Sequence, residues 1–312
     1  MKEVLIVLSV VLSIILLILI VSFVVFMLVF YSRTRKPPKE GEYPLPKGKV
    51  YEPYYDKLIE GIKIVRSFPY KEVSIVSQDK LTLRGKYYEF KKNAPIEIMF
   101  HGYRGNSERD LAGGVIRAKM VNHNVLLVDN RASGRSDGHL ITFGAKEQED
   151  CLKWIDFVVE NIDEKAKIIL SGVSMGASTV LLASGKPLRK NVIGIIADCG
   201  YTSAKDIIKK VLKQIHLPTF IFYPLIRLGA IIFGGFDINE VNPKEAVKKA
   251  TLPIIFFHGK VDDFVPLYMS QENFNNAGSP KKRLVVMEEA GHGLCFMLEE
   301  ERYLQEVREF FN

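Results

Sequence analysis

The chain has few cysteines and histidines, and their scarcity excludes several classes of protein. Its 312 residues include three cysteines (Cys151, Cys199 and Cys295) and six histidines. An odd, widely spaced set of cysteines does not form a disulfide framework and is typical of reduced thiols. The spacing of the Cys and His residues does not suggest a metal site either. We therefore expect a protein without disulfides, metal or cofactor.

Near its start, the chain lacks charged residues over 28 consecutive positions, from Val4 to Tyr31. At about 1.5 Å per residue, a helix of this length exceeds the hydrocarbon core of a bilayer, which is roughly 30 Å thick. A cleaved signal peptide is the alternative, but its apolar region has only about 7–15 residues. We therefore predict one transmembrane anchor over residues 1–32.

The charges that flank this segment predict its orientation. On one side Lys2 is offset by Glu3, whereas the other side begins with Arg33, Arg35 and Lys36. The positive-inside rule then places the following domain in the cytoplasm, behind a single-pass anchor in the cell membrane. The reduced thiols agree with this compartment.

Much of the excess positive charge lies in one short segment after the anchor. Residues 33–49 hold six basic and two acidic side chains and contribute +4 to the net charge of +7. Such a cluster suits an anionic lipid surface and requires no nucleic-acid partner. Its prolines favour an extended spacer over residues 33–69 that lifts the domain off the bilayer. An irregular surface tail without a role is the alternative that the sequence leaves open.

Eight apolar segments are the predicted strands of a domain over residues 70–312. They lie at residues 72–77, 81–90, 95–100, 125–128, 167–171, 192–197, 253–257 and 283–287. The first two are separated by a short polar turn and are expected to form an antiparallel hairpin. The others alternate with helical segments, which predicts a doubly wound, mostly parallel α/β sheet.

The most informative motif is Gly172–Gly176, in which a serine stands between two glycines (Gly-Val-Ser-Met-Gly). A predicted strand precedes it, and the small aliphatic residues 177–183 that follow predict a helix. A serine at such a strand-to-helix turn is a nucleophile elbow, because the glycines allow a turn that is too tight for a Cβ atom. Ser174 is therefore the predicted nucleophile.

A serine hydroxyl needs a general base, and the base needs an acid that fixes its tautomer. Asp262 follows the apolar strand 253–257, and His292 follows the strand 283–287. Both residues, like the serine of the elbow, come just past the carboxyl end of a strand, where open α/β sheets bind their ligands. The order serine, acid, histidine is that of hydrolases built on this elbow.

Together these motifs resemble those of α/β hydrolases, from about Tyr70 to the end of the chain. The matching pieces are His-Gly-Tyr-Arg-Gly-Asn at 101–106, the elbow, His-Gly-x-x-Asp-x-x-Val-Pro at 258–266, Gly-His at 291–292 and Asp-x-Arg-x-x-Gly-x-Ser at 129–136. The last piece is expected to fix the geometry of a loop beside the site. The chain is most similar to membrane-tethered bacterial hydrolases described as serine aminopeptidase-like or esterase-like.

The resemblance implies an oxyanion hole and bears on the choice of the acid. By carry-over from the His-Gly piece, the backbone N–H of Tyr103 joins that of Met175 as the two donors. The Val-Pro pair favours Asp262 over its neighbour Asp263. Asp198 remains a further alternative, because some relatives place the acid after that strand.

The stretch 199–250 is longer than one crossover helix requires, so we expect it to form a small helical lid. Its part 217–236 has a single charge, Arg227, and reads as two short apolar helices that line an acyl pocket within reach of the bilayer. A second transmembrane helix is one alternative, although Pro224 interrupts it and a mid-membrane Arg costs about 2.5–3.5 kcal/mol. Ordinary packing against the sheet is another alternative.

These inferences combine into a membrane-anchored serine hydrolase that cleaves carboxylic esters, or amides, through an acyl-enzyme. Ser174 attacks, His292 transfers the proton and Asp262 orients His292. A carboxylesterase or lipase acting on an apolar acyl group is favoured, and an aminopeptidase-like amide hydrolase is the alternative. An alternative of another class is a catalytically silent, membrane-bound interaction module. Because the site lies beyond Tyr70, deleting residues 1–32 is expected to leave a folded, active domain.

Overall fold

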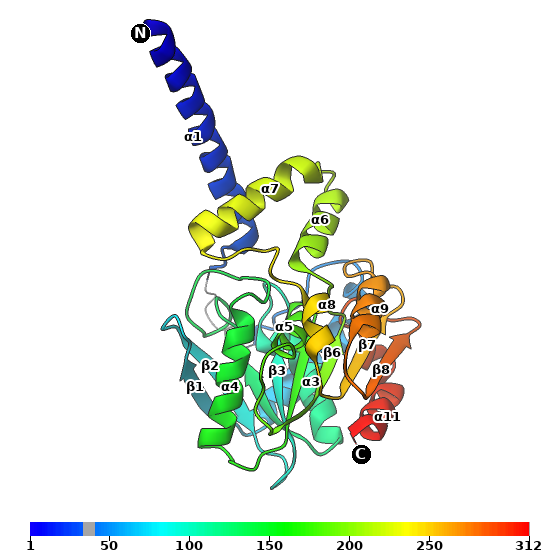
Figure 1. The fold of residues 1–312 in the computed structure, drawn as a ribbon. Helices are drawn as coiled ribbons and strands as arrows, with labels where there is room; N and C mark the ends of the chain where they lie inside the picture. The colour runs from blue at the N-terminus through cyan, green and yellow to red at the C-terminus, as the bar shows by residue number, and fades with distance from the viewer. Residues whose placement is uncertain (34–40, 312) are drawn as a thin grey trace.

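A computed structural model describes residues 1–33 and 41–311 of the chain. Residues 34–40, which belong to the basic, proline-containing part of the expected spacer, lie outside the described residues. Figure 1 shows a central sheet flanked by helices, from which the first helix projects as a long rod.

Eight strands form one sheet, in the order β1-β2-β4-β3-β5-β6-β7-β8. Their bounds are Lys71–Val76 (β1), Thr82–Tyr88 (β2), Ile96–Phe100 (β3), Asn124–Val128 (β4), Ile168–Val173 (β5), Val192–Asp198 (β6), Ile254–Gly259 (β7) and Lys282–Met287 (β8). Strand β2 runs antiparallel to β1 and β4, and the other neighbours pair in parallel. The predicted hairpin and the mostly parallel, eight-stranded sheet are thus confirmed.

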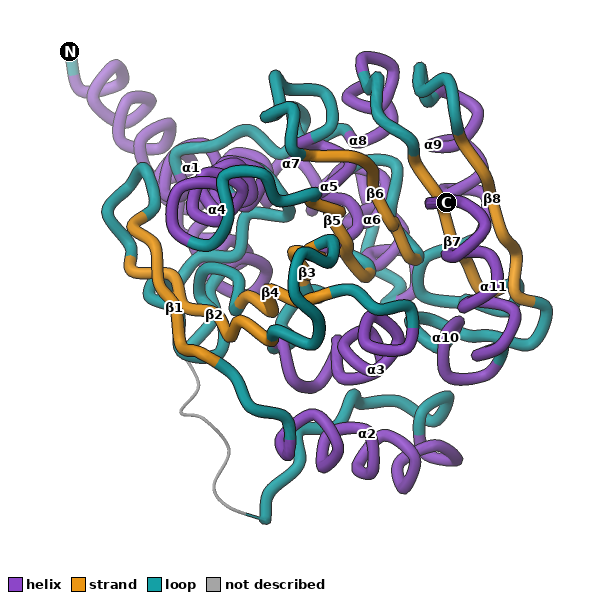
Figure 2. Tube along the Cα trace, turned by 90° about the horizontal axis from the view of Figure 1, so that it is seen from below, coloured by secondary structure: helices purple, strands orange, loops and turns teal. Residues whose placement is uncertain are grey.

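Helices cover both faces of the sheet (Figure 2). One face carries α4 (Glu147–Asn161), α5 (Met175–Ala183), α8 (Pro243–Ala246) and α9 (Leu267–Asn276), and the other carries α3 (Ser107–Met120), α10 (Cys295–Leu298) and α11 (Glu300–Phe311). Strands β3, β4 and β7 are buried along their whole length, as parallel strands between two helical layers are. This arrangement brings the carboxyl ends of β5, β7 and β8 to one edge of the sheet.

The first helix, α1 (Lys2–Phe30), projects from the domain but is also built into it. Among the described residues it is the one helix that is long and apolar enough to cross a membrane. Its last turns are buried, and the ring of Phe30 contacts Phe143 and Phe236 at centroid distances of 5.7 and 5.3 Å. The expectation that residues 1–32 are dispensable therefore conflicts with the structure, because the aromatic end of α1 is part of the core.

The segment expected to be an extended spacer contains a helix instead. After a short 3-10 turn at Glu52–Tyr54, helix α2 (Tyr55–Ser67) packs on the outside of α3. Ile62 and Val65 are buried in this contact, because apolar residues recur on one face of the helix. The described part of the segment therefore lies against the domain and does not lift it off a surface.

The stretch 199–250 forms helices, as expected. Helix α6 (Ala204–Gln214) leads upward from the edge of the sheet to α7 (Thr219–Gly229), which continues into the π-helical turn η2 (Ala230–Gly234). Helix α7 packs against α1, and Figure 1 shows both on the same side of the domain. The joint helix Thr219–Gly234 is shorter than a membrane span requires, which argues against a second transmembrane helix.

Candidate active site

The predicted elbow is a sharp turn between β5 and α5. Ser174 has φ 57° and ψ −117°, a strained backbone for a residue with a side chain. A Cβ atom on Gly176 would lie 1.9 Å from the carbonyl oxygen of Phe100, and one on Gly172 would lie 2.3 Å from the backbone of Gly176. Only glycine fits at these two positions, so the sequence builds the tight turn that places the largely buried Ser174 at the wall of a cleft.

Asp262 and His292 meet at the edge of the sheet, past the ends of β7 and β8. His292 Nδ1 donates to Asp262 Oδ2 at 2.7 Å. The other oxygen, Oδ1, accepts the backbone N–H groups of Phe264 and Val265 at 2.9 and 2.8 Å. The carboxylate is thereby held in one orientation, and it leaves His292 Nε2 free to face a substrate.

A second histidine lies beneath this pair. His258 is fully buried at the end of β7, as expected of a structural residue, and its Nε2 is 3.5 Å from Asp262 Oδ2. Burial alone would raise the pKa of Asp262, but interactions with His258 and His292 outweigh it and hold that pKa well below its usual range. Asp262 is therefore ionised wherever His292 acts as a base.

The neighbouring carboxylate, Asp263, is placed differently. Its side chain is exposed, and its carbonyl oxygen accepts hydrogen bonds from Lys210 and Gln214 of α6. Helix α6 thus supports the turn that carries the acid. Asp263 makes no hydrogen bond to His292 among the contacts of the described residues.

The other alternative, Asp198, lies at the end of β6 and is buried. Its Oδ2 accepts a long hydrogen bond of 3.4 Å from the Tyr303 hydroxyl, and its Oδ1 has no partner among the described residues. Burial raises the pKa of Asp198 to about 6. The geometry pairs the histidine with Asp262 and leaves Asp198 beside the site.

Cys199, whose place next to Asp198 indicates a core residue and not a reactive thiol, lies beside the site. It follows β6, is fully buried and has φ 48°. Its thiol lies within 4.8 Å of ligand atoms of Asp262 and His292, so it packs directly beside the acid and the histidine. A positive φ is not visible in a sequence, so only the structure reveals this placement.

Cys199, Asp262 and His292 also form the one group among the described residues whose ligand atoms lie close enough for a metal, within 4.8 Å of one another. Burial raises the pKa of the Cys199 thiol well above its ordinary value, which opposes the thiolate that a metal requires. His292 Nδ1 is already bonded to Asp262. The trio fits an acid–base pair with a structural thiol better than a metal centre.

The expected oxyanion loop lies directly against the elbow. A Cβ atom on Gly102 would be 3.5 Å from the Cβ of Ser174. Among the described residues, the backbone N–H groups of Tyr103 and Met175 donate to no acceptor, whereas Gly102 N–H is bonded to Asp110 Oδ2 at 3.0 Å. Two unpaired amides beside the serine are what an oxyanion hole requires.

The same loop contacts the end of α1. The Tyr103 hydroxyl donates to the carbonyl oxygen of Val29, and the Arg104 guanidinium donates to those of Leu28 (2.6 Å) and Tyr31 (3.1 Å). These carbonyls belong to the carboxyl end of the helix, where a cation is stabilised by the helix dipole. The position of α1 is therefore linked to the loop that carries one expected oxyanion donor.

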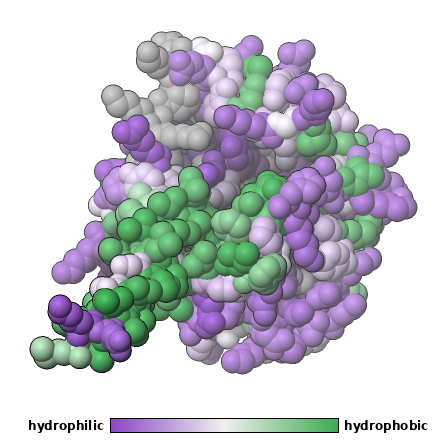
Figure 3. All heavy atoms as spheres, turned by 90° about the horizontal axis from the view of Figure 1, so that it is seen from above, coloured by the Kyte–Doolittle hydropathy of each residue, from purple (hydrophilic) through white to green (hydrophobic). Residues whose placement is uncertain are grey.

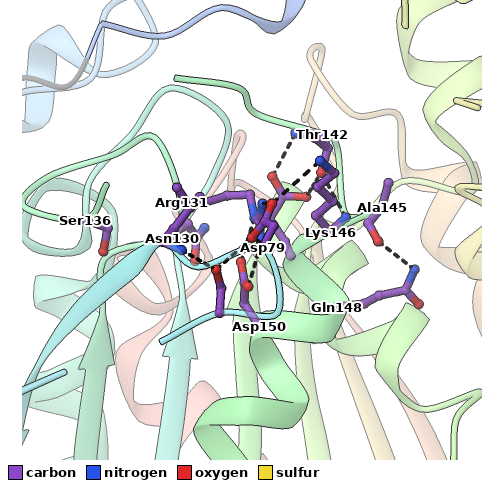
Figure 4. A network of polar contacts seen from close by, with 12 residues as sticks. Asp79, Asn130, Arg131, Ser136, Thr142, Ala145, Lys146, Gln148 and Asp150 are labelled. Carbon is purple, nitrogen blue, oxygen red and sulfur yellow. Dashed lines mark hydrogen bonds and ion pairs between the residues drawn. The ribbon is translucent and has the colours of Figure 1, made fainter. Parts of the chain in front are cut away.

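A buried polar network fixes the loop after β4, beside the site (Figure 4). Arg131 donates to Asp150 and Asp79 at 2.7 and 2.8 Å. The next residue back, Asn130, donates through its backbone N–H to His101 Nε2 at 3.1 Å. Ion pairs thus hold the loop 129–136 in place, and the hydrogen bond from Asn130 to His101 connects it to the oxyanion loop.

Ser174 and His292 line a common cleft of about 900 Å³. Its walls come from the oxyanion loop, α3, the loop after β8 and, unexpectedly, residues 45–64. Tyr51 also lines this cleft, and its hydroxyl donates to the carbonyl oxygen of His292 at 3.1 Å. Among the described lining residues, none comes from 204–250. The lid helices were expected to line this pocket but do not, and the segment 45–64 lines it instead.

Comparisons with known proteins agree with this architecture. No family model matches the chain. The Bacillus subtilis protein YqkD is 27% identical over 190 residues, which cover 61% of this chain and 62% of YqkD. The protein bem46 of Schizosaccharomyces pombe is 26% identical over 219 residues, 69% of this chain and 68% of bem46. The chain thus spans only about three fifths of the length of YqkD.

Among solved structures, a Pyrococcus furiosus esterase is similar with a TM-score of 0.65 and 24% identity, over 89% of this chain and 97% of that one. A Pyrococcus horikoshii acylaminoacyl peptidase is similar with a TM-score of 0.56 and 17% identity, over 82% of this chain and 43% of that one. Likeness at this identity concerns the fold. The chain thus has the α/β hydrolase fold.

Proposed function

We propose that this protein is a membrane-anchored serine hydrolase that cleaves carboxylic esters, or amides, through an acyl-enzyme. The observation that carries the proposal is the Asp262–His292 hydrogen bond of 2.7 Å in the cleft that also holds the strained Ser174. An ionised acid, an oriented imidazole and a serine hydroxyl that lines the cleft are the parts that nucleophilic acyl transfer needs.

In this mechanism, Ser174 Oγ attacks the carbonyl carbon of the substrate while His292 Nε2 accepts its proton. The Met175 and Tyr103 amides stabilise the oxyanion, and removing such a donor typically costs about 3 kcal/mol of transition-state stabilisation. His292 then returns the proton to the leaving alcohol or amine, and Asp262 stabilises the imidazolium throughout. Water, deprotonated by the same imidazole, releases the acid and restores the serine.

The lining of the cleft supports an apolar acyl group. Apolar side chains from residues 45–64, among them Leu45, Leu58 and Ile64, join Ile116 and Phe296 around it. Each buried methylene adds about 0.8 kcal/mol of binding, so medium acyl chains are preferred over acetyl. Cleavage of amides is the second candidate, and the likeness to an acylaminoacyl peptidase favours it.

Helix α1 supplies the proposed membrane anchor. Its exposed part is apolar, and its flanking charges favour a cytoplasmic position for the domain. The partners proposed are an acyl substrate and the membrane, with no nucleic acid.

The substrate class is tested with p-nitrophenyl esters of increasing chain length beside aminoacyl amides. We expect turnover of esters with a preference for medium chains. Leu58→Trp, which fills the cleft, shifts this preference to shorter chains, whereas Lys63→Trp on the exposed face of α2 does not. A profile that is flat with chain length, or one that both variants change equally, contradicts an acyl pocket at this place.

A further inference from the structure

The helix formed by α7 and η2 has an apolar face that remains largely exposed among the residues that the structure describes. We call it the outer face and define it by Phe220, Ile221, Ile231, Ile232 and Phe233. These side chains are between 38% and 79% exposed, with Phe220 the most exposed. Isolated apolar residues are normal on a protein surface, but a contiguous group of large ones marks a contact site.

The outer face is continuous with the exposed surface of α1. A Cβ atom on Gly229 would lie 2.6 Å from the carbonyl oxygen of Ser22, so α7 and α1 approach closely at this glycine. The ring of Phe233 contacts that of Phe23 edge to face, with centroids 5.1 Å apart. Figure 3 shows the hydrophobic surface of the projecting helix merging with a hydrophobic area at its base.

The length of α1 sets the depth of this contact in a bilayer. Lys2 and Glu3 mark one boundary of the apolar segment, and the twenty residues from Val4 to Phe23 rise about 30 Å, the thickness of the hydrocarbon core. Phe23 then lies at the near boundary of the hydrocarbon, and Phe233 beside it lies at the same level. Helix α7 rises further from the domain toward its amino end, as Figure 1 shows.

We propose that the outer face is embedded in the lipid leaflet nearest to the domain, so that α7 and η2 form a second membrane contact beside the anchor. The occupant of the face is lipid, because the face adjoins the span and shares its depth. This inference rests on the proposal that α1 crosses the membrane. It makes the domain a fixed body on the bilayer surface and not one that swings on a tether.

The charge in α7 does not oppose this placement. Arg227 is the one charged residue of the helix, and its guanidinium forms a two-fold ion pair with Asp237 at 2.6 and 2.9 Å. Tyr223 and Ile226 of the same helix are buried toward the domain. The helix therefore pairs its one charge with Asp237, turns Tyr223 and Ile226 to the domain and leaves its large apolar residues outward, as interfacial helices do.

Quenching of tryptophan fluorescence by brominated phosphatidylcholine tests the proposal in proteoliposomes of the full chain. The single native tryptophan, Trp154, is buried in the domain core and provides a constant background. Phe220→Trp and Ile232→Trp report on the outer face. Leu12→Trp reports on the anchor, and Val76→Trp, at an exposed position of β1, is the control away from the membrane.

We expect brominated lipid to remove most of the added emission of the Phe220→Trp, Ile232→Trp and Leu12→Trp proteins and none of that of Val76→Trp. Quenching of Leu12→Trp without quenching of the two outer-face variants overturns the proposal and leaves the anchor standing. Unquenched outer-face emission with a blue shift identifies a protein partner or a second copy as the occupant instead. If Leu12→Trp is also unquenched, both the anchor and the second contact are wrong.

Discussion

At the scale of single residues, the site depends on backbone geometry that particular side chains permit. The two glycines of the elbow were recognised from their spacing, and the structure shows why each is needed. Ser174, Asp262 and His292 were selected from motifs, and the fold brings them to one edge of the sheet. Motifs did not select Cys199 and Tyr51 as residues of the site, because both lie there through contacts between segments far apart in the sequence.

The first prediction concerns the acid. Asp262→Asn lowers kcat by about 10⁴-fold, because an amide in place of the carboxylate favours the wrong tautomer of His292. Asp263→Asn is the matched control and leaves kcat within a few-fold of the wild type, since its side chain is exposed to solvent. Steady-state kinetics on an ester substrate measure both. A larger loss in Asp263→Asn than in Asp262→Asn would show that the acid is misassigned.

A second prediction concerns the buried Asp198. Its folded pKa of about 6 lies above the unfolded value of about 3.9, so the folded state binds the proton more tightly. The contribution of Asp198 to the free energy of unfolding therefore falls as the pH rises from about 4 to about 6. An asparagine at this position does not titrate, so Asp198→Asn removes this loss. Between pH 4 and pH 7, the free energy of unfolding of the variant therefore rises by about 2 kcal/mol relative to that of the wild type.

Urea unfolding of the full chain in detergent micelles, followed by Trp154 fluorescence, measures this difference at the two pH values. Parallel pH dependences of wild type and variant would mean that Asp198 does not titrate in this range.

At the scale of elements, the eight strands and the mostly parallel sheet were predictable, and the packing of the added segments was not. Alternation of apolar segments and turns indicated all eight strands, since buried parallel strands are apolar throughout. Helix α2 was missed because prolines nearby favoured an extended chain. The lid helices were recognised, but their partner was not, because the sequence does not show that α7 packs on α1.

The third prediction concerns the end of α1. Phe30→Ala lowers the free energy of unfolding by about 3 kcal/mol, because it leaves a cavity in a core that includes Phe143 and Phe236. Leu28→Ala is the control, since that side chain is 67% exposed and its carbonyl remains for Arg104. Thermal unfolding in micelles compares them. Equal midpoints for the two variants would show that α1 is a separable tether.

At the scale of the whole molecule, the anchor, the oxyanion loop and the cleft are connected. The end of helix α1 bonds to Tyr103 and Arg104, so the proposed anchor and the proposed catalytic centre form one body. The charges that flank α1 favour a cytoplasmic domain. The sequence allowed the anchor and the domain to be predicted separately, but not this contact, which arises only when both are folded together.

A fourth prediction follows from those charges. In a bacterial host, we expect a green fluorescent protein fused to the carboxyl end to fluoresce and alkaline phosphatase at the same place to be inactive, because the proposed orientation puts that end in the cytoplasm with the domain. Fusion of the same reporters to a protein of known topology serves as the control. Active phosphatase with a dark fluorescent protein would place the domain on the outer side.

The measurement that tests the central claim most directly is labelling by a fluorophosphonate probe in intact membranes. Attack by Ser174 Oγ forms an O–P bond and expels fluoride, so the wild type is labelled, and Ser174→Ala is not. His292→Gln is labelled far more slowly, because no base accepts the proton, while Ser178→Ala, a buried serine of α5, is labelled like the wild type. Labelling that persists in Ser174→Ala, or a wild type that is never labelled, would contradict the account and favour a catalytically silent protein.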